Sequence, residues 1–203
     1  MDLKQFISEQ LEESAETKKL TIDACKESII QSIDLILGSI RNRGKLMLCG
    51  NGGSAADAQH LAAEMVIRLS HDIERPGLPA LALTTDSSIL TASGNDIGFD
   101  NIFARQIEAL GNPEDVLLVI TTSGNSPNIL KALEMAKEKS IKSIRFFGGS
   151  GGKCRDKVTI PIIIPSSNIQ RIQETHITLG HIIIEIVERD LHEKSSTDIL
   201  INH

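Results

Sequence analysis

The sequence predicts an α/β fold of three layers, in which helices flank a five-stranded, parallel, doubly wound sheet. Five short apolar runs recur along the chain, and several of them precede turns rich in Gly, Ser, Thr and Asn. Segments with the apolar spacing of helices separate these runs. Strands that alternate with helices are typical of such a sheet. The 203 residues are enough for one domain, and no Pro- or Gly-rich linker divides residues 1–203.

The N-terminal region, residues 1–40, is predicted to be helical because apolar residues recur in it at three-to-four spacing. We expect two helical stretches or one long helix, used in oligomerisation. The segment from Asn168 to about Lys194 is predicted to be a long helix with isoleucine on nearly every side, which indicates burial against the sheet and another subunit. Residues 195–203 are expected to form a loose tail.

The predicted strands lie between these two helical regions. They are the apolar runs 46–49, 80–83, 116–120, 144–147 and 160–164. Helices are expected from Ser54 to about Leu69 and from Pro127 to about Glu138. Ligands of parallel sheets bind beyond the carboxyl ends of the strands, so the segments after the first four strands are the expected location of the chemistry.

The composition excludes several classes of function. A net charge of −6 and an aromatic content of 2%, with no Trp or Tyr, argue against binding to nucleic acid. Three cysteines without a C-x-x-C pair are typical of a reduced, cytoplasmic setting. The N-terminus has no apolar signal core, and no apolar run approaches the roughly 20 residues of a membrane helix, so we expect no membrane association.

A glycine-rich turn, Gly50-Asn-Gly-Gly-Ser-Ala55, follows the first strand and opens a helix. Backbone N–H groups and the helix dipole at such a turn suit anions or polyols. The same letters fit the dinucleotide fingerprint G-x-G-x-x-A, which also requires an acidic residue at the end of the next strand about 20 residues on. That strand ends later, at Thr84 and Thr85, so we expect no nucleotide cofactor.

Polar residues of the next helix form a second candidate group. Asp57, His60 and Glu64 lie three and four residues apart and therefore on one helix face. His and Glu at this spacing can share a metal, act as acid and base on one substrate, or form a surface ion pair. The segment Thr121-Thr-Ser-Gly-Asn-Ser126, between a strand and a helix, is a candidate cradle for a phosphate, with Ser126 as helix N-cap.

The last helix carries a third group, Gln173, Glu174, His176 and His181. Gln173 and His181 are eight residues apart, which separates them by about 12 Å along the helix axis, so holding one metal from both is a tight fit. Taken alone, His181 resembles a hydrogen-bonded core histidine.

Together these segments resemble the sugar isomerase (SIS) domain family and, within it, the phosphoheptose isomerases. The resemblance spans nearly the whole chain. It is carried by Cys49–His60, Glu64, Arg75-Pro-Gly, Gly94-Asn-Asp-Ile-Gly-Phe99, Thr122-Ser-Gly-Asn-Ser126, Arg171-Ile-Gln-Glu-Thr-His176 and His181.

The resemblance implies an aldose–ketose isomerase that converts sedoheptulose 7-phosphate to D-glycero-D-manno-heptose 7-phosphate through an enediol. This reaction would be the first step toward nucleotide-activated heptose for the lipopolysaccharide core. The same resemblance implies a homotetramer with sites at subunit interfaces, and one zinc ion per subunit.

The resemblance also implies roles for individual residues. Glu64 and His181 would be catalytic, moving protons between the first two carbons. The zinc ligands would be His60, Glu64, Gln173 and His181. Substrate would contact Asn51, Gly52, Gly53, Ser54, Glu64, Asn95, Asp96, Thr121, Thr122, Ser123, Ser126 and Gln173. Whether His181 reaches Glu64 within one chain or from a neighbouring subunit is left open.

The chain departs from the family pattern in three places, one of which is Thr121, where Ser is usual and the hydroxyl is kept. The segment from Val66 to Glu74 is about two residues longer than is usual in the family, which leaves its path open. The stretch 146–150 lacks a usual Thr hydroxyl, so we assign no substrate contact there. The rival hypothesis is a non-catalytic tetramer of the same fold that binds the replication initiator protein. Its members lack the counterparts of Glu64 and His181, which are both present here.

Overall fold

The computed structural model describes residues 1–149 and 158–201, with side chains described as far as residue 192. Five parallel strands form one sheet in the order β2-β1-β3-β4-β5. The strands are β1 (Leu46–Gly50), β2 (Ala80–Ala82), β3 (Val116–Ile120), β4 (Lys142–Gly148) and β5 (Ile160–Ile164). The predicted α/β fold with a doubly wound parallel sheet is therefore confirmed, and the runs predicted for β3 and β5 match the observed bounds.

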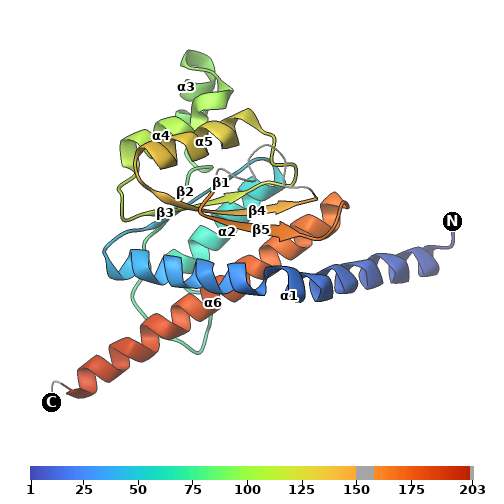
Figure 1. Ribbon diagram of the computed structural model, residues 1–203, viewed down its shortest axis with the longest axis horizontal. Helices are drawn as coiled ribbons and strands as arrows, with labels where there is room; N and C mark the ends of the chain where they lie inside the picture. The colour runs from blue at the N-terminus through green and yellow to red at the C-terminus, as the bar shows by residue number, and fades with distance from the viewer. Residues whose placement is uncertain (150–157, 202–203) are drawn as a thin grey trace.

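Helices cover both faces of the sheet, as Figure 1 shows. One face carries α1 (Leu3–Arg41), α2 (Gly53–Val66) and α6 (Ile169–Ile201). The other carries α4 (Ile102–Leu110) and α5 (Pro127–Glu138), with α3 (Ser87–Asp96) and the short 3₁₀ helix η1 (Phe99–Asn101) beyond them.

The two faces have separate apolar cores because successive strand residues point to opposite sides. Leu46 and Leu48 of β1 pack into the core under α1, α2 and α6. Met47 and Cys49, which alternate with them, pack into the core under α4 and α5. All strand residues of β1 and β3 are buried, which explains their uninterrupted apolar sequence.

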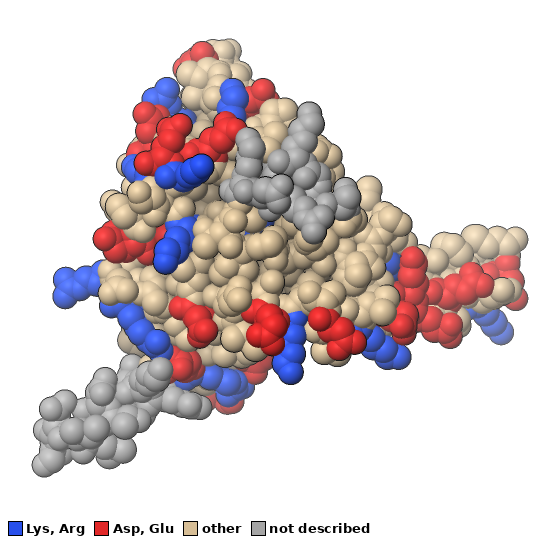
Figure 2. Space-filling model, viewed as in Figure 1, with Lys and Arg blue, Asp and Glu red and all other residues tan. Residues whose placement is uncertain are grey.

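The N-terminal region is one helix, α1, so the second of the two forms expected for residues 1–40 is observed. Asp2 is its N-cap and accepts a hydrogen bond from the backbone N–H of Lys4 at 2.9 Å. The first half of α1 extends beyond the sheet (Figure 1), and its large apolar residues, including Leu3 and Leu11, are exposed. Acidic side chains, Glu9, Glu12, Glu13 and Glu16 among them, gather on this half of the helix (Figure 2).

The last helix differs from its expected bounds. α6 continues through residues 195–201, which we expected to form a loose tail, while residues 202 and 203 lie outside the described residues. Conversely, α2 ends at Val66, earlier than the expected end near Leu69.

Two of the three cysteines lie in the described part of the fold. Cys25 and Cys49 are buried free thiols, and Cys154 lies outside the described residues. Among the described helices, none combines the length and the apolar character that a membrane span requires.

Candidate functional site

The glycine-rich turn after β1 places the first turn of α2 at the carboxyl edge of the sheet. Gly52 is the N-cap of α2 with a φ of +56°, a conformation that favours glycine. A Cβ built on Gly53 would lie 3.0 Å from Nε2 of Gln173, on α6. The glycine therefore allows α6 to bring Gln173 close to the start of α2, and Ser54 is buried in the next position.

Asn51 joins this turn to the first turn of α5, the helix that follows β3. Its side-chain amide exchanges two hydrogen bonds with that of Asn128, Nδ2 to Oδ1 at 3.0 Å and 2.8 Å. The strands β1 and β3 are neighbours in the sheet, and the order β2-β1-β3-β4-β5 reverses between them. A crevice at such a reversal is the usual binding place in doubly wound sheets. The amide pair therefore fixes the two sides of this crevice to each other.

The loop 121–126 supplies hydroxyl groups beside the crevice. The backbone N–H of Gly124 donates to the buried Oγ1 of Thr121 at 3.4 Å. Ser126 is the N-cap of α5 with Pro127 after it, as predicted, but its side chain makes no capping hydrogen bond. Its hydroxyl thus remains available to an anion at the N-terminus of α5.

A cavity of about 310 Å³ adjoins this loop. Thr122 and Ser123 line it together with Gly148 and Gly149 at the end of β4. We had assigned no contact to the stretch 146–150, because a Thr hydroxyl is missing there. The position of this stretch at the carboxyl end of a parallel strand does indicate a place in a site, because backbone groups there can line a cavity even where no side chain does.

The predicted catalytic pair lies together within one chain. Oε1 of Glu64, on α2, is 2.9 Å from Nε2 of His60 and 3.4 Å from Nε2 of His181, on α6. The rings of His60 and His181 meet edge to face, with centroids 5.1 Å apart. The side chain of Glu64 is 14% exposed, and those of the two histidines are 51% and 39% exposed, so the cluster is open to ligand.

Charge and burial act in opposite directions at this cluster. Burial raises the pKa of Asp57, one turn before His60, while positive charge on His60 and His181 lowers it. Oε2 of Glu64 is buried and has no hydrogen-bond partner among the described residues. A buried, unsatisfied carboxylate oxygen is costly unless a ligand, metal or water satisfies it.

The other polar residues of α6 have different surroundings. His176 is fully buried beside Phe146, and burial lowers its pKa to about 4. Glu174 pairs with Arg171 at 2.9 Å. His176 is thus a neutral core residue, and the core environment considered for His181 is found at His176 instead.

The donor atoms of the cluster lie close enough together to share a metal ion. One ligand atom from each of His60, Glu64 and His181 lies within 4.8 Å of the other two. Two imidazoles and a carboxylate are a common donor set for zinc, and the unsatisfied Oε2 of Glu64 also indicates a missing partner. The residues therefore fit a zinc ion. Gln173, the fourth expected ligand, is on the same helix as His181, and its amide lies against Gly53 at the start of α2.

Two expected substrate contacts lie apart from this cluster within the chain. Asn95 and Asp96 are exposed at the end of α3, where the Asn95 amide donates to the Asp96 carboxylate at 2.7 Å. α3 packs against η1 and α4, on the side of the sheet opposite α2 and α6 (Figure 1). One chain does not bring these residues to Glu64 and His181.

A buried ion pair beside the cluster was missed by sequence reasoning. Arg75 and Glu188 form it at 2.7 Å, with side chains 3% and 0% exposed. Glu188 also accepts backbone hydrogen bonds from Leu69 and Ser70, so the lengthened segment after α2 docks on α6. Arg75 was visible only as part of a motif, and no periodicity connects it with Glu188, since the two are far apart in sequence.

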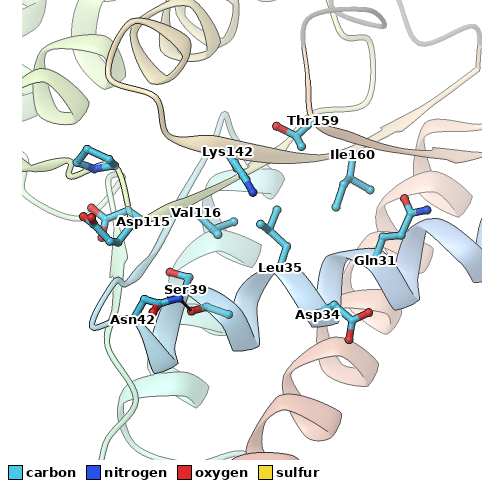
Figure 3. Close-up of a pocket in the computed structure, with 13 residues that line it drawn as sticks. Gln31, Asp34, Leu35, Ser39, Asn42, Asp115, Val116, Lys142, Thr159 and Ile160 are labelled. Carbon is cyan, nitrogen blue, oxygen red and sulfur yellow. Dashed lines mark hydrogen bonds between the residues drawn. The ribbon is translucent and has the colours of Figure 1, made fainter.

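Another cavity lies at the opposite edge of the sheet. It measures about 930 Å³ and lies between α1 and the amino ends of β3, β4 and β5. Ser39, Asp115 and Lys142 are among its lining residues (Figure 3), and none of the predicted site residues lines it. Position at the amino edge separates this cavity from the chemistry of the carboxyl edge.

Comparisons with known proteins identify relatives of the chain. The SIS domain family matches residues 10–148. The chain is 47% identical to a phosphoheptose isomerase of Roseiflexus over 190 residues, 94% of this chain and 95% of that one. It is 49% identical to the Aquifex aeolicus phosphoheptose isomerase over 183 residues, 90% and 95% of the two chains.

Solved structures give the same picture. A phosphoheptose isomerase from Francisella tularensis superposes with a TM-score of 0.89 at 41% identity, covering 93% of this chain and all of the other. One from Neisseria gonorrhoeae gives 0.84 at 40% identity, covering 92% and 99%.

Proposed function

The chain belongs to the phosphoheptose isomerases of the SIS family, which makes it a sugar-phosphate isomerase, and from this premise we propose its substrate and mechanism. The substrate is sedoheptulose 7-phosphate and the product is D-glycero-D-manno-heptose 7-phosphate, the first step toward nucleotide-activated heptose. The observation that carries the proposal is the contact of Glu64, on α2, with His181, on α6, within one chain.

The reaction moves one proton between adjacent carbons. A base removes a proton from carbon 1 of the ketose, and the electron pair forms the double bond of an enediol with carbon 2. The electron pair of the carbon 2 carbonyl moves to its oxygen, which takes up a proton. A proton then adds to carbon 2 while the hydroxyl on carbon 1 loses its proton and becomes the aldehyde. An acid and a base within reach of the two carbons are therefore the minimum requirement.

Glu64 is the proposed base, and His181 is its proposed partner. The unsatisfied Oε2 of Glu64 leaves one carboxylate oxygen ready to accept a proton, while Oε1 faces His60 and His181. His181 is half-exposed and can return a proton to the neighbouring carbon or oxygen. The rival hypothesis of a non-catalytic binding module lacks support, because both residues are present and in contact.

The phosphate of the substrate is proposed to bind to the loop 121–126. Thr121, Thr122, Ser123 and Ser126 offer hydroxyls there, and the N-terminus of α5 adds a favourable dipole. Asn51, Gly52, Gly53 and Ser54 would bind the sugar at the start of α2. This division places the anion beside neutral donors and the reacting carbons beside Glu64.

Zinc is proposed as the metal of the cluster, one ion per subunit, held by His60, Glu64, Gln173 and His181. When bound, it would supply a Lewis acid that stabilises negative charge on the enediolate oxygens. The chain's own residues still perform the proton transfer.

A homotetramer with sites at its interfaces is proposed as the active form. The exposed apolar residues of α1 and a groove of about 560 Å³ between α1 and α6, lined by Ile22, Ile30, Ile182 and Ile186, support further subunit contacts. Such an assembly would bring Asn95 and Asp96 of one subunit to the site of another. We also propose a cytoplasmic location, in keeping with the two buried thiols.

The experiment for this function is direct. Purified protein is incubated with sedoheptulose 7-phosphate, and the formation of an aldose phosphate is followed with and without added zinc. Sedimentation of the same preparation gives the oligomeric state. Turnover that E64Q and H181A lack supports the proposal, and no turnover in the wild type under either condition favours the binding module.

A further inference from the structure

We infer that Arg75 is a positioning residue that clamps α2 to α6 and thereby sets the distance between Glu64 and His181. The inference deepens the proposed function, on which its kinetic test rests. The clamp is a three-way set of hydrogen bonds from one buried guanidinium.

The first contact of the clamp is with the C-terminus of α2. Nη2 of Arg75 donates to the backbone carbonyl of Glu64 at 2.9 Å. Carbonyls in the last turn of a helix have no partner within the helix. A cation there also interacts favourably with the partial negative charge of the helix dipole. The neighbouring carbonyls are satisfied by backbone, Ala63 by Ile67 and Met65 by Leu78. Arg75 thus holds the main chain of the proposed base itself.

The second contact of the clamp is with α6. Nε of Arg75 donates to Oε1 of Glu188 at 2.7 Å. Glu188 follows His181 by seven residues, which is about two helical turns, so both side chains project from the same face of α6. Nη1 of Arg75 donates to the carbonyl of Pro76 at 2.9 Å, which fixes the guanidinium against its own loop. A single rigid group therefore connects the backbone of Glu64 with the helix that carries His181.

The bonds to Glu188 also serve a plainer purpose, and the two roles can be separated. Glu188 accepts from the backbone N–H groups of Leu69 and Ser70, which docks the loop after α2 whether or not Arg75 is present. The hydrogen bond to the Glu64 carbonyl, in contrast, is donated by Arg75 itself. A lysine side chain has one nitrogen in place of the planar guanidinium and cannot reach both the Glu64 carbonyl and the Glu188 carboxylate.

The chain offers a matched control on the same helix and loop. Arg189 pairs with Asp72 of that loop at 3.5 Å and with Glu185 at 3.0 Å. Both contacts are exposed at the surface, and neither reaches Glu64. Removing Arg189 therefore deletes a cation and a loop contact without touching the clamp.

The test compares kinetics of R75K, E188Q and R189A at equal amounts of folded protein, measured by circular dichroism and sedimentation. R75K is expected to lower kcat on the order of 100-fold with KM within about 3-fold of wild type, because a displacement of about 1 Å has this effect on proton transfer. E188Q retains an oxygen for Arg75 but turns an amide toward Ser70, so it should lower kcat less than about 5-fold. R189A should keep kcat within about 2-fold.

Crystal structures supply a readout that needs no turnover. In R75K the separation of Glu64 Oε1 and His181 Nε2 should lengthen, whereas in R189A it should stay as in wild type. If R75K does not fold, the neutral pair R75Q/E188Q leaves no unpaired buried charge and removes the same clamp, with the same expected loss of kcat.

The outcomes are distinct. An unchanged Glu64–His181 separation in R75K or the neutral pair, or a kcat within about 3-fold of wild type, overturns the clamp. Loss of kcat in E188Q equal to that in R75K shows loop docking alone and also overturns it. If the wild type does not convert sedoheptulose 7-phosphate, the proposed function fails, and the structures still decide for or against the clamp.

Discussion

Nε2 of His181 lies 3.4 Å from Oε1 of Glu64, although the two residues belong to helices that are far apart in the sequence. α2 and α6 pack on the same face of the sheet, and this packing brings the pair together. One chain therefore contains both groups of the proposed proton transfer, which the sequence had left open.

The Glu64→Gln substitution tests the proposed base. The amide keeps the shape of the side chain but cannot accept the substrate proton, so kcat should fall by about 10³-fold or more. Size-exclusion chromatography should show the same oligomer as the wild type. Full activity in this variant would contradict the role of Glu64.

Replacing His181 with Ala removes the second group. The expected loss in kcat is about 10²- to 10⁴-fold, because one positioned acid is removed while the phosphate loop is untouched. Replacing His176, five residues earlier and fully buried, should instead affect stability. Equal turnover by H181A and wild type would remove His181 from the mechanism.

Ser126→Ala tests the phosphate loop. The hydroxyl makes no capping bond, so α5 should be scarcely destabilised, while KM for the sugar phosphate should rise about 10-fold with kcat nearly unchanged. Inorganic phosphate should inhibit the variant more weakly than the wild type. Ser39→Ala, at the amino edge of the sheet and thus at the edge opposite the loop, serves as control. A fall in kcat with unchanged KM would argue against phosphate binding here.

Asn128→Ala tests the amide pair across the crevice. Asn51 would lose both hydrogen bonds to a partner that is itself 2% exposed, so the free energy of unfolding should drop by about 1–3 kcal/mol. A double-mutant cycle with Asn51→Ala should reveal a coupling between the two residues. Additive effects in urea unfolding would show that the pair does not act as a unit.

His176 predicts a pH dependence of stability. Its folded pKa of about 4 is below the usual value near 6.5, so the unfolded chain binds more protons between these values. Stability from this group is fully present above about pH 6.5 and is lost as the pH falls toward 4, by about 3 kcal/mol in total. Urea unfolding at pH 7.5 and pH 5 should show a smaller difference in His176→Leu. An identical slope in the variant would contradict the assignment.

Much of the fold was predictable because its signals are local. The strands β3 and β5 are apolar runs bounded by polar turns, and α5 begins at Pro127 after a Ser N-cap. The end of α2 was not predictable, because apolar residues continue after Val66 while the chain leaves the helix to dock on α6.

The site was predictable in its parts but not in its assembly. The turn at Gly52 and the face shared by His60 and Glu64 follow from local spacing. The approach of His181 to Glu64 depends on tertiary packing of α6, which no local pattern encodes. The buried pair of Arg75 and Glu188 was missed for the same reason, since each residue in sequence resembles an ordinary surface charge.

The most direct measurement follows purified wild-type protein with sedoheptulose 7-phosphate by NMR. We predict that the ketose signal is replaced by that of an aldose 7-phosphate, and that E64Q leaves the ketose unchanged. Absence of the aldose in the wild type, with and without zinc, would contradict the account.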